Sequence, residues 1–256
     1  MNNPRIAAQL YTVREYMKTA DDIEKGLKKI KDMGYNAVQV SGIGKIADEA
    51  LKDLVDEIGL KICVTHIPFD RMQNDIDGVI KQHKLWDCDY VGLGSMPMNA
   101  RADKDSVLAF AKEANEIGRV LADNGLRFVY HNHAFEFAKF DGKTIMDILL
   151  EETDENFGFE IDTYWVQAGG ANPVDWIYKV EGRMDVVHFK DMGMNHENKQ
   201  MMTEVGEGNL NWVDIIKACN ETGVKWAPVE QDICQRNPFE SLEISLNNLI
   251  DLGLKS

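Results

Sequence analysis

The sequence has few cysteines and no long apolar run. Its 256 residues include four cysteines (Cys63, Cys88, Cys219 and Cys234), with no CxxC pair, so neither a zinc ribbon nor a disulfide framework is indicated. We therefore expect reduced thiols and a cytoplasmic protein. No apolar run approaches the length of a spanning helix, and the first residues lack the charged-then-apolar pattern of a secretory signal. We accordingly expect no membrane association.

Basic residues are also scarce relative to acidic ones. Lys and Arg number 28 against 43 Asp and Glu, which gives a formal net charge of −15. Nucleic acids and anionic membranes are bound by basic surfaces, so we expect neither as a partner. Hydrophobic residues make up 44% of the chain, which is enough to bury a sizeable core and excludes a disordered chain.

Short apolar runs alternate with amphipathic stretches along the whole chain. This alternation predicts a parallel sheet with right-handed crossovers, and eight strand–helix units in about 250 residues fit a (β/α)8 TIM barrel. We predict an α/β protein with a single barrel domain over residues 1–256. The expected strands are 6–10, 37–40, 61–65, 90–93, 126–130, 157–161, 184–187 and 226–229, and the expected helices are 23–33, 51–58, 76–85, 104–123, 144–150, 173–180, 212–222 and 238–250.

An open, doubly wound sheet is the alternative fold. Such a sheet usually carries a glycine-rich phosphate turn after its first strand, whereas Tyr11-Thr12-Val13-Arg14 follows the first strand here. The later Gly206-Glu207-Gly208 is too short for a nucleotide fingerprint and is predicted to be a loop turn. The barrel is therefore favoured.

Histidines and carboxylates gather at the ends of the predicted strands, where barrel enzymes carry their chemistry. Four of the six histidines lie at such ends: His66, His131, His133 and His188. Asp162, His188 and Glu230 end strands six, seven and eight, so we expect them to converge at the barrel mouth. One imidazole with carboxylates suits a divalent cation, with Mn²⁺ as first choice and Zn²⁺, Co²⁺ or Mg²⁺ as alternatives.

Each of these three residues also has an ordinary structural interpretation. Asp162 could cap the turn after its strand, and a lone buried His188 could be a satisfied core histidine. Glu230 follows a buried strand, where an unpaired carboxylate is costly and needs a metal or a cationic partner. The convergence of all three favours metal ligation.

His131 and His133 share a two-residue spacing, so both are expected to point into the mouth. Such a pair can ligate a metal or transfer protons near neutral pH, and Glu136 on the loop beyond could reach inward. We assign catalysis to His131, His133 and Glu230 and add Glu136 to the metal ligands. Whether His131 or Glu136 provides the fourth ligand is left open by the sequence.

Other polar and aromatic residues near the same ends are predicted to contact substrate. Lys190 lies two residues beyond His188 and shares its facing, so it could bind a substrate oxygen, although a lysine is more often solvated. Trp165 could form an apolar wall against a sugar ring. His66 could contact substrate, or it could be an ordinary polar residue at the end of a strand. The predicted substrate-binding residues are Gln9, Tyr11, His66, Trp165 and Lys190.

Several motifs together resemble a known family. They are the Gln9-Leu10-Tyr11-Thr12-Val13-Arg14 opening and the segments 34–39, 129–137, 160–163, 187–191, 206–209 and 229–230. In this order they are similar to the xylose isomerase-like TIM barrels, also called the sugar phosphate isomerase/epimerase family, over essentially the whole chain.

The resemblance implies a metal site of Glu, Asp, His and Glu from strands five to eight. Asp162, His188 and Glu230 match three of these places, but His131 occupies the fifth-strand Glu place, and Gln39 stands where many members carry Glu. Epimerases of the family move a proton between two metal-bound glutamates, so the change weakens the case for two-base chemistry. The segment 131–137 instead resembles the branch with keto-inositol dehydratases and keto-sugar lyases. The family's DNA-repair endonucleases are disfavoured by the net charge of −15.

The predicted function is a metal-dependent isomerase or epimerase that acts on a sugar or keto-sugar through an enediolate. One alternative is a keto-sugar or inosose-type dehydratase or lyase on the same metal site. The other is a non-catalytic sugar-binding barrel. The expected partner is a small sugar, keto-sugar or cyclitol without phosphate. A homo-oligomer would be common for a barrel, but the sequence indicates no interface.

Overall fold

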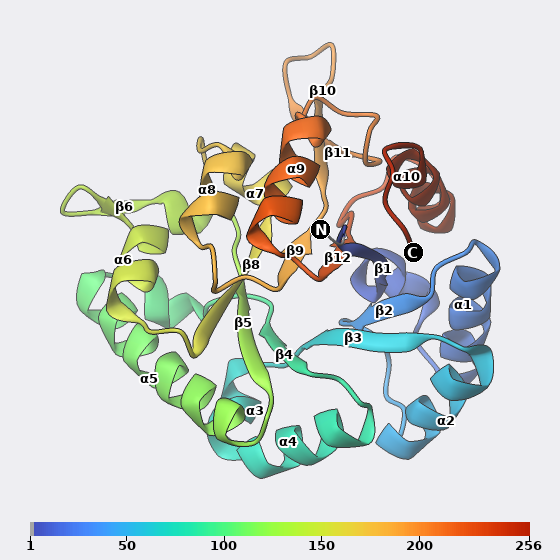
Figure 1. The fold of residues 1–256 in the computed structure, drawn as a ribbon, viewed down its shortest axis with the longest axis horizontal. Coiled ribbons are helices and arrows are strands. Elements are labelled where there is room, and N and C mark those ends of the chain that lie inside the picture. The colour runs from blue at the N-terminus through green and yellow to red at the C-terminus, as the bar shows by residue number, and fades with distance from the viewer. Residues whose placement is uncertain (1–2) are drawn as a thin grey trace.

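The computed structural model describes residues 3–256, which contain a closed barrel of eight parallel strands (Figure 1). The hydrogen-bonded order is β1-β12-β9-β8-β5-β4-β3-β2, which confirms the predicted TIM barrel. Residues 1 and 2 of the predicted domain lie outside the described residues. The barrel strands are β1 (Arg5–Gln9), β2 (Ala37–Val40), β3 (Lys61–His66), β4 (Tyr90–Leu93), β5 (Arg127–His131), β8 (Phe157–Asp162), β9 (Val186–His188) and β12 (Trp226–Val229).

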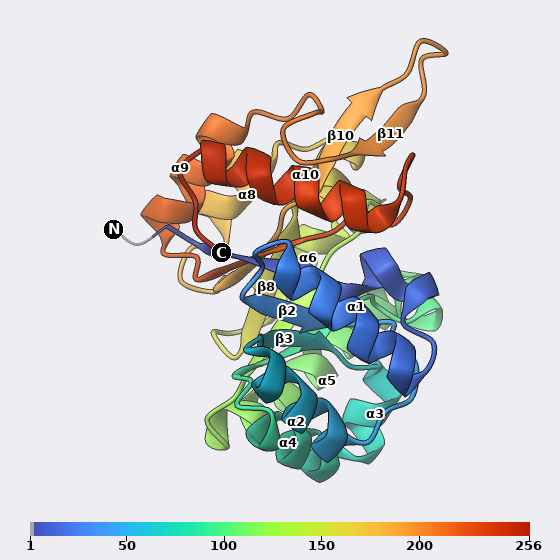
Figure 2. The same cartoon turned by 90° about the vertical axis from the view of Figure 1, so that its right-hand side faces the viewer.

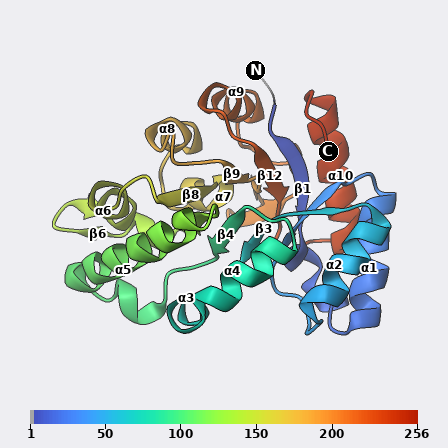
Figure 3. The ribbon, with the colours of Figure 1, turned by 60° about the horizontal axis from the view of Figure 1, so that its bottom comes forward.

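A ring of helices covers the outside of the barrel (Figure 3). Their apolar faces pack on the strands, as the helical spacing predicted. The helix α10 begins as expected, with Asn237 as N-cap and Pro238 in the first turn. No helix among residues 3–256 is both long and apolar enough to cross a membrane. The helices of the ring are α1 (Ala20–Asp32), α2 (Asp48–Ile58), α4 (Ile76–Leu85), α5 (Lys104–Asp123), α6 (Ile145–Glu152), α8 (Pro173–Lys179), α9 (Trp212–Thr222) and α10 (Pro238–Asp251).

Short additional elements follow the carboxyl ends of the barrel strands, and the sequence did not predict them. Most span only one or two turns or a few paired residues, which is too short for periodicity to reveal. They build the rim that surrounds the site. The elements are η1 (Leu10–Tyr16), α3 (Phe69–Asn74), η2 (Met98–Arg101), η3 (Phe135–Phe137), β6 (Lys139–Phe140), β7 (Lys143–Thr144), α7 (Thr163–Ala168), β10 (Asp191–Met194) and β11 (Gln200–Thr203).

The hairpin of β10 and β11 projects from the barrel (Figure 2) and is anchored at its base by Asp191. This buried carboxylate accepts hydrogen bonds from the backbone N–H of Gly206 at 2.9 Å and from Nε1 of Trp212 at 2.6 Å. A Cβ at Gly208 would lie 2.4 Å from Asp191 Oδ1, so only glycine fits there. The glycine-rich segment is therefore a turn folded around a carboxylate.

Candidate metal centre and active site

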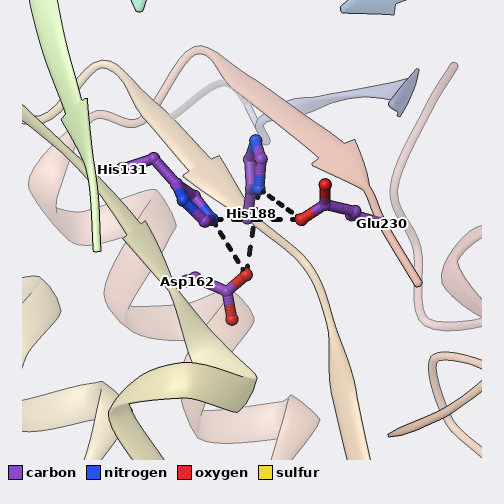
Figure 4. A group of neighbouring side chains, drawn as sticks. All are labelled: His131, Asp162, His188 and Glu230. Carbon is purple, nitrogen blue, oxygen red and sulfur yellow. Dashed lines mark hydrogen bonds and ion pairs between the residues drawn. The ribbon is translucent and has the colours of Figure 1, made fainter. Parts of the chain in front are cut away.

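Four side chains from neighbouring strands meet at the carboxyl end of the barrel (Figure 4). They are His131 at the end of β5, Asp162 at the end of β8, His188 at the end of β9 and Glu230 directly after β12. Each offers a ligand atom within 4.8 Å of the others, and all four are buried. The barrel order β5-β8-β9-β12 brings together residues that are up to a hundred positions apart in the chain.

The ring of His131 is held by a backbone carbonyl. Its Nδ1 donates to the carbonyl oxygen of Gly94 at 3.0 Å. Its Nε2 lies 3.1 Å from Asp162 Oδ2 and 3.9 Å from Glu230 Oε2. Histidines that bind metals characteristically donate their second ring nitrogen to a carbonyl or carboxylate in this way.

The ring of His188 is held in the opposite sense. Its Nε2 lies 2.6 Å from Gln39 Oε1 and 3.0 Å from Glu160 Oε1, two acceptors on the side away from the cluster. Its Nδ1 faces Glu230 Oε2 at 3.1 Å and Asp162 Oδ2 at 3.8 Å. Each imidazole thus has one anchored nitrogen and directs the other at the same two carboxylate oxygens.

Asp162 uses its two carboxylate oxygens for different tasks. Oδ1 accepts a hydrogen bond from the backbone N–H of Trp165 at 2.8 Å and caps α7. Oδ2 faces the imidazoles of the cluster. Asp162 therefore caps the helix with one oxygen and leaves the other in the cluster that could hold a metal.

Lys190 is fully buried and lies beside the same oxygens. Its Nζ lies 3.0 Å from Asp162 Oδ2, 2.7 Å from Glu230 Oε2 and 2.7 Å from Asp232 Oδ2. Burial alone would lower the pKa of Lys190, but the surrounding carboxylates outweigh it and raise the pKa above its ordinary value. The lysine is accordingly a buried ammonium and not a solvated surface residue.

The negative charges of the carboxylates favour a positive charge between them and the imidazoles. Burial by itself would lower the pKa of His188, yet the charges of Glu160 and Glu230 raise it to about 10. A positive charge is thus favoured where Nδ1 meets the carboxylates, and either a proton or a divalent ion can provide it. The donor set of two anchored imidazoles and two carboxylates fits Mn²⁺ or Zn²⁺. The cluster could therefore bind a metal.

Glu136, the other candidate for fourth ligand, does not join the cluster. Its Oε1 accepts a hydrogen bond from the Tyr130 hydroxyl at 2.6 Å, and its Oε2 accepts one from the His133 backbone N–H at 2.8 Å. Burial raises the pKa of this carboxyl to about 7. His131, and not Glu136, therefore lies in the four-residue cluster that could hold a metal, and Glu136 instead holds the backbone that carries His133.

A cavity of about 940 Å³ opens beside the cluster. Tyr11 and His66, both predicted to contact substrate, line this cavity together with His131, His133 and Glu230. The other three predicted contacts are not among the residues that line the cavity. Gln9 is fully buried and accepts a hydrogen bond from the Tyr11 N–H, Lys190 is fully buried, and Trp165 is half-buried.

Two further histidines, His66 and His133, line the cavity outside the four-residue cluster, and His66 forms a second group with Glu160 and His188 that could hold a metal. His66 Nε2 lies 2.7 Å from Glu160 Oε2, so a buried carboxylate orients this ring. His133 packs edge-on against His131, with ring centroids 4.8 Å apart, and its buried Nδ1 has no partner among the described residues. Burial lowers the pKa of His133 to about 3, so its ring is neutral. A neutral imidazole beside the cavity can accept a proton.

Sequence reasoning missed two carboxylates of the centre, Glu160 and Asp232. Glu160 lies on β8 two residues before Asp162, and Asp232 lies two residues after Glu230. Side chains two apart on an extended segment share a face, so the argument applied to Lys190 would have found both. The sequence therefore predicted fewer carboxylates in the centre than the structure contains.

Comparison with known proteins identifies the family. The family model described as "Xylose isomerase-like TIM barrel" matches residues 27–243. The chain belongs to this family. A crystal structure of a sugar phosphate isomerase/epimerase from Parabacteroides distasonis superposes on this family member with a TM-score of 0.80 at 25% identity, covering 96% of this chain and 98% of that one. A structure of L-ribulose 3-epimerase, with a TM-score of 0.72 at 15% identity and coverage of 98% and 94%, shares the fold.

The curated relatives are longer than this chain. An inosose dehydratase from Clostridium beijerinckii is 25% identical over 209 residues, which cover 75% of this chain and 64% of that protein. An inosose dehydratase from Clostridium botulinum is 28% identical over 148 residues, which cover 51% of this chain and 49% of that protein. The chain thus spans between about half and two thirds of the length of the curated relatives it matches.

Proposed function

We propose that this protein is a metal-dependent dehydratase that acts on an unphosphorylated keto-sugar or keto-cyclitol. The observation that supports the proposal is that His131 lies in the cluster that could hold a metal, whereas Glu136 lies outside it. Without a metal-bound glutamate on β5, the pair of opposed glutamate bases used by the family's epimerases is incomplete. The similarity to proteins named inosose dehydratase supports the same choice.

The lining of the cavity supports an uncharged substrate. Among the described residues, no Lys or Arg lines the cavity. Four carboxylates line it: Asp70, Glu113, Glu230 and Asp232. A phosphate group would meet carboxylates without a cationic partner, which is unfavourable. Hydroxyl and carbonyl oxygens carry no such penalty.

His131, Asp162, His188 and Glu230 would hold the divalent ion, with Mn²⁺ as first choice. When bound, such an ion stabilises negative charge on the oxygen of a substrate carbonyl. Gln39 and the carbonyl of Gly94 hold the two imidazoles in the orientation that binding requires.

The residues of the cavity wall would move the protons. His133 takes the proton from the carbon next to the carbonyl, and that electron pair forms a carbon–carbon double bond. The carbon–oxygen bond at the next carbon breaks, and the departing hydroxyl receives the proton that His133 accepted and leaves as water, which returns His133 to its neutral form. The net change is loss of one water, so no oxidant or reductant is needed. Glu160 keeps the ring of His66 oriented throughout.

The test is turnover of an inosose by the Mn²⁺-loaded protein, followed by ultraviolet absorbance of the unsaturated product and by mass spectrometry. We expect His133→Asn to lower kcat by about 10²–10⁴-fold, because the proton acceptor is lost. His196→Asn, at an exposed histidine of the hairpin loop, is the matched control and keeps full activity. Full activity of His133→Asn, or no turnover by the loaded wild type, would contradict the proposal.

Isomerisation or epimerisation is the second candidate. It is favoured by the presence of two imidazoles, His66 and His133, on the cavity wall, because a proton removed by one could be returned by the other. Deuterium from D₂O would then enter a product that has lost no water. A purely sugar-binding barrel would incorporate no deuterium.

A further inference from the structure

The cavity extends well beyond the polar centre. Its second part, called here the apolar lobe, is lined by the segment after β3, the segment after β4 and helix α5. Apolar and polar side chains from these segments line it together. The apolar residues that line the apolar lobe are Ile67, Phe69, Leu93, Pro97, Ala109 and Phe110, and the uncharged polar residues beside them are Gln73, Ser95, Asn99 and Ser106.

The walls of the apolar lobe are part of the packed core. The rings of Phe69 and Phe110 lie with centroids 5.0 Å apart, and Phe110 meets Tyr130 at 5.9 Å. Phe69, Leu93 and Phe110 are all buried by their own packing. The lobe is therefore pre-formed, and a ligand that enters it does not first have to order the walls.

The cavity is large for an unsubstituted sugar. Sites of about 300–1,000 Å³ enclose drug-sized ligands, and this cavity of about 940 Å³ lies near the upper end of that range. A six-carbon ring has only about a dozen non-hydrogen atoms and would fill the polar end beside His131 and Glu230 alone. Hydroxyl groups gain nothing from an apolar wall, so the lobe suits a chemically different part of the ligand.

We propose that the apolar lobe binds an uncharged, aromatic-sized substituent carried by the substrate, which is therefore a glycoside or ether of a keto-sugar or keto-cyclitol. The polyhydroxylated part lies at the metal centre, as the proposed function requires, and the substituent lies between Phe69 and α5. Asp70 and Glu113 also line the cavity, and Glu113 accepts a hydrogen bond from Nε2 of Gln73 at 2.8 Å. Because these carboxylates would repel a negative charge, an anionic substituent is disfavoured.

The lobe can be filled without disturbing the core. Ala109 is exposed on α5 and lines the cavity, so Ala109→Trp places an indole in the lobe. Lys112→Trp is the matched control, because it puts the same side chain on an exposed position of the same helix that does not line the cavity. Circular dichroism and thermal unfolding establish that both variants are folded.

The probes are phenyl and methyl β-D-glucopyranoside, whose affinities are compared by calorimetry with Mn²⁺ present. Burial of the phenyl ring makes the wild type bind the phenyl glucoside about tenfold more tightly or better. Ala109→Trp brings the affinity ratio close to one, and Lys112→Trp leaves it at the wild-type value. Equal affinities in the wild type, no binding of the phenyl glucoside at millimolar concentration, or a preference that survives Ala109→Trp would overturn the proposal. Turnover of inosose by the wild type is scored separately, so that failure of the dehydratase function and failure of the lobe are distinguished.

Discussion

The amide oxygen of Gln39 lies 2.6 Å from Nε2 of His188, and the amide nitrogen of Gln39 donates to Glu160 Oε1 at 3.0 Å. One neutral side chain thus joins a buried imidazole to a buried carboxylate, on the side of His188 that faces away from Asp162 and Glu230. This arrangement keeps Nδ1 of His188 directed at Asp162 and Glu230.

Replacing Gln39 by Leu should weaken metal binding while leaving every proposed ligand in place. The substitution keeps similar volume but removes the acceptor that orients His188, and loss of such a supporting partner typically costs about 10–100-fold in affinity. Titration of Mn²⁺ followed by electron paramagnetic resonance measures the change. Gln200→Leu, at an exposed position of β11, serves as the control, and equal affinities in the two variants would refute the role given to Gln39.

Asp162→Asn and Asp162→Ala separate the two tasks of this side chain. Both remove the charge that faces the imidazoles, so both should lose Mn²⁺ affinity by more than the effect at Gln39. Only Asn keeps an oxygen for the Trp165 N–H, so the Ala variant should be less stable than the Asn variant by about 0.5–2 kcal/mol. Denaturant unfolding without metal measures this difference, and equal stabilities would show that the cap contributes nothing.

Lys190→Met tests whether a cation is required in the centre. Without the ammonium, Asp162, Glu230 and Asp232 face one another uncompensated, and removal of one partner of such a buried group costs about 3–5 kcal/mol. Saturating Mn²⁺ should then raise the melting temperature of Lys190→Met by more than it raises that of the wild type. An equal rise in the two proteins would mean that the lysine and the ion do not act on the same carboxylates. Lys199→Met, on the exposed hairpin, controls for loss of a lysine.

The pH dependence of stability should contain a contribution from His83. This buried ring donates from Nδ1 to the Val79 carbonyl at 2.8 Å and accepts the Thr65 hydroxyl at Nε2, also at 2.8 Å, so its neutral form is fully bonded. Burial lowers its pKa from 6.5 to about 4. The unfolded chain therefore binds the proton more readily, and the stability from this group is complete above pH 6.5 and lost as the pH falls toward 4.

The size of that contribution follows from the pKa difference. A shift of about 2.5 units corresponds to about 3 kcal/mol. His83→Gln should remove that part of the pH dependence, so the wild-type and variant curves of unfolding free energy against pH should converge or cross as acid is added. Parallel curves between pH 4 and 6.5 would contradict the assignment.

Periodicity in the sequence was enough to predict the barrel. The expected strands at 37–40, 90–93 and 226–229 coincide with β2, β4 and β12, and the other expected strands are offset from theirs by one or two residues at one or both ends. The hairpin after β9 was not predicted because its strands, DMGM and QMMT, contain polar residues and glycine and are only partly buried. They therefore lack the continuous apolar run of a barrel strand that is buried on both faces. Strand ends also identified Asp162, His188 and Glu230 as neighbours, because parallel strands in a closed barrel end on one rim.

The choice between His131 and Glu136 required the tertiary structure. Both follow β5 within five residues, and nothing local indicates that the Tyr130 hydroxyl and the His133 N–H bind both oxygens of Glu136. Lys190 is a second example. Its spacing from His188 predicted the direction of its side chain, but the sequence did not reveal its three carboxylate partners. The order of residues along the chain determined which strands form the barrel and which polar groups stand at its mouth. Only the closed barrel decided which nitrogen of each imidazole faces the carboxylates, which carboxylates share one cation and how far the cavity extends, because these depend on contacts between strands that are distant in the sequence.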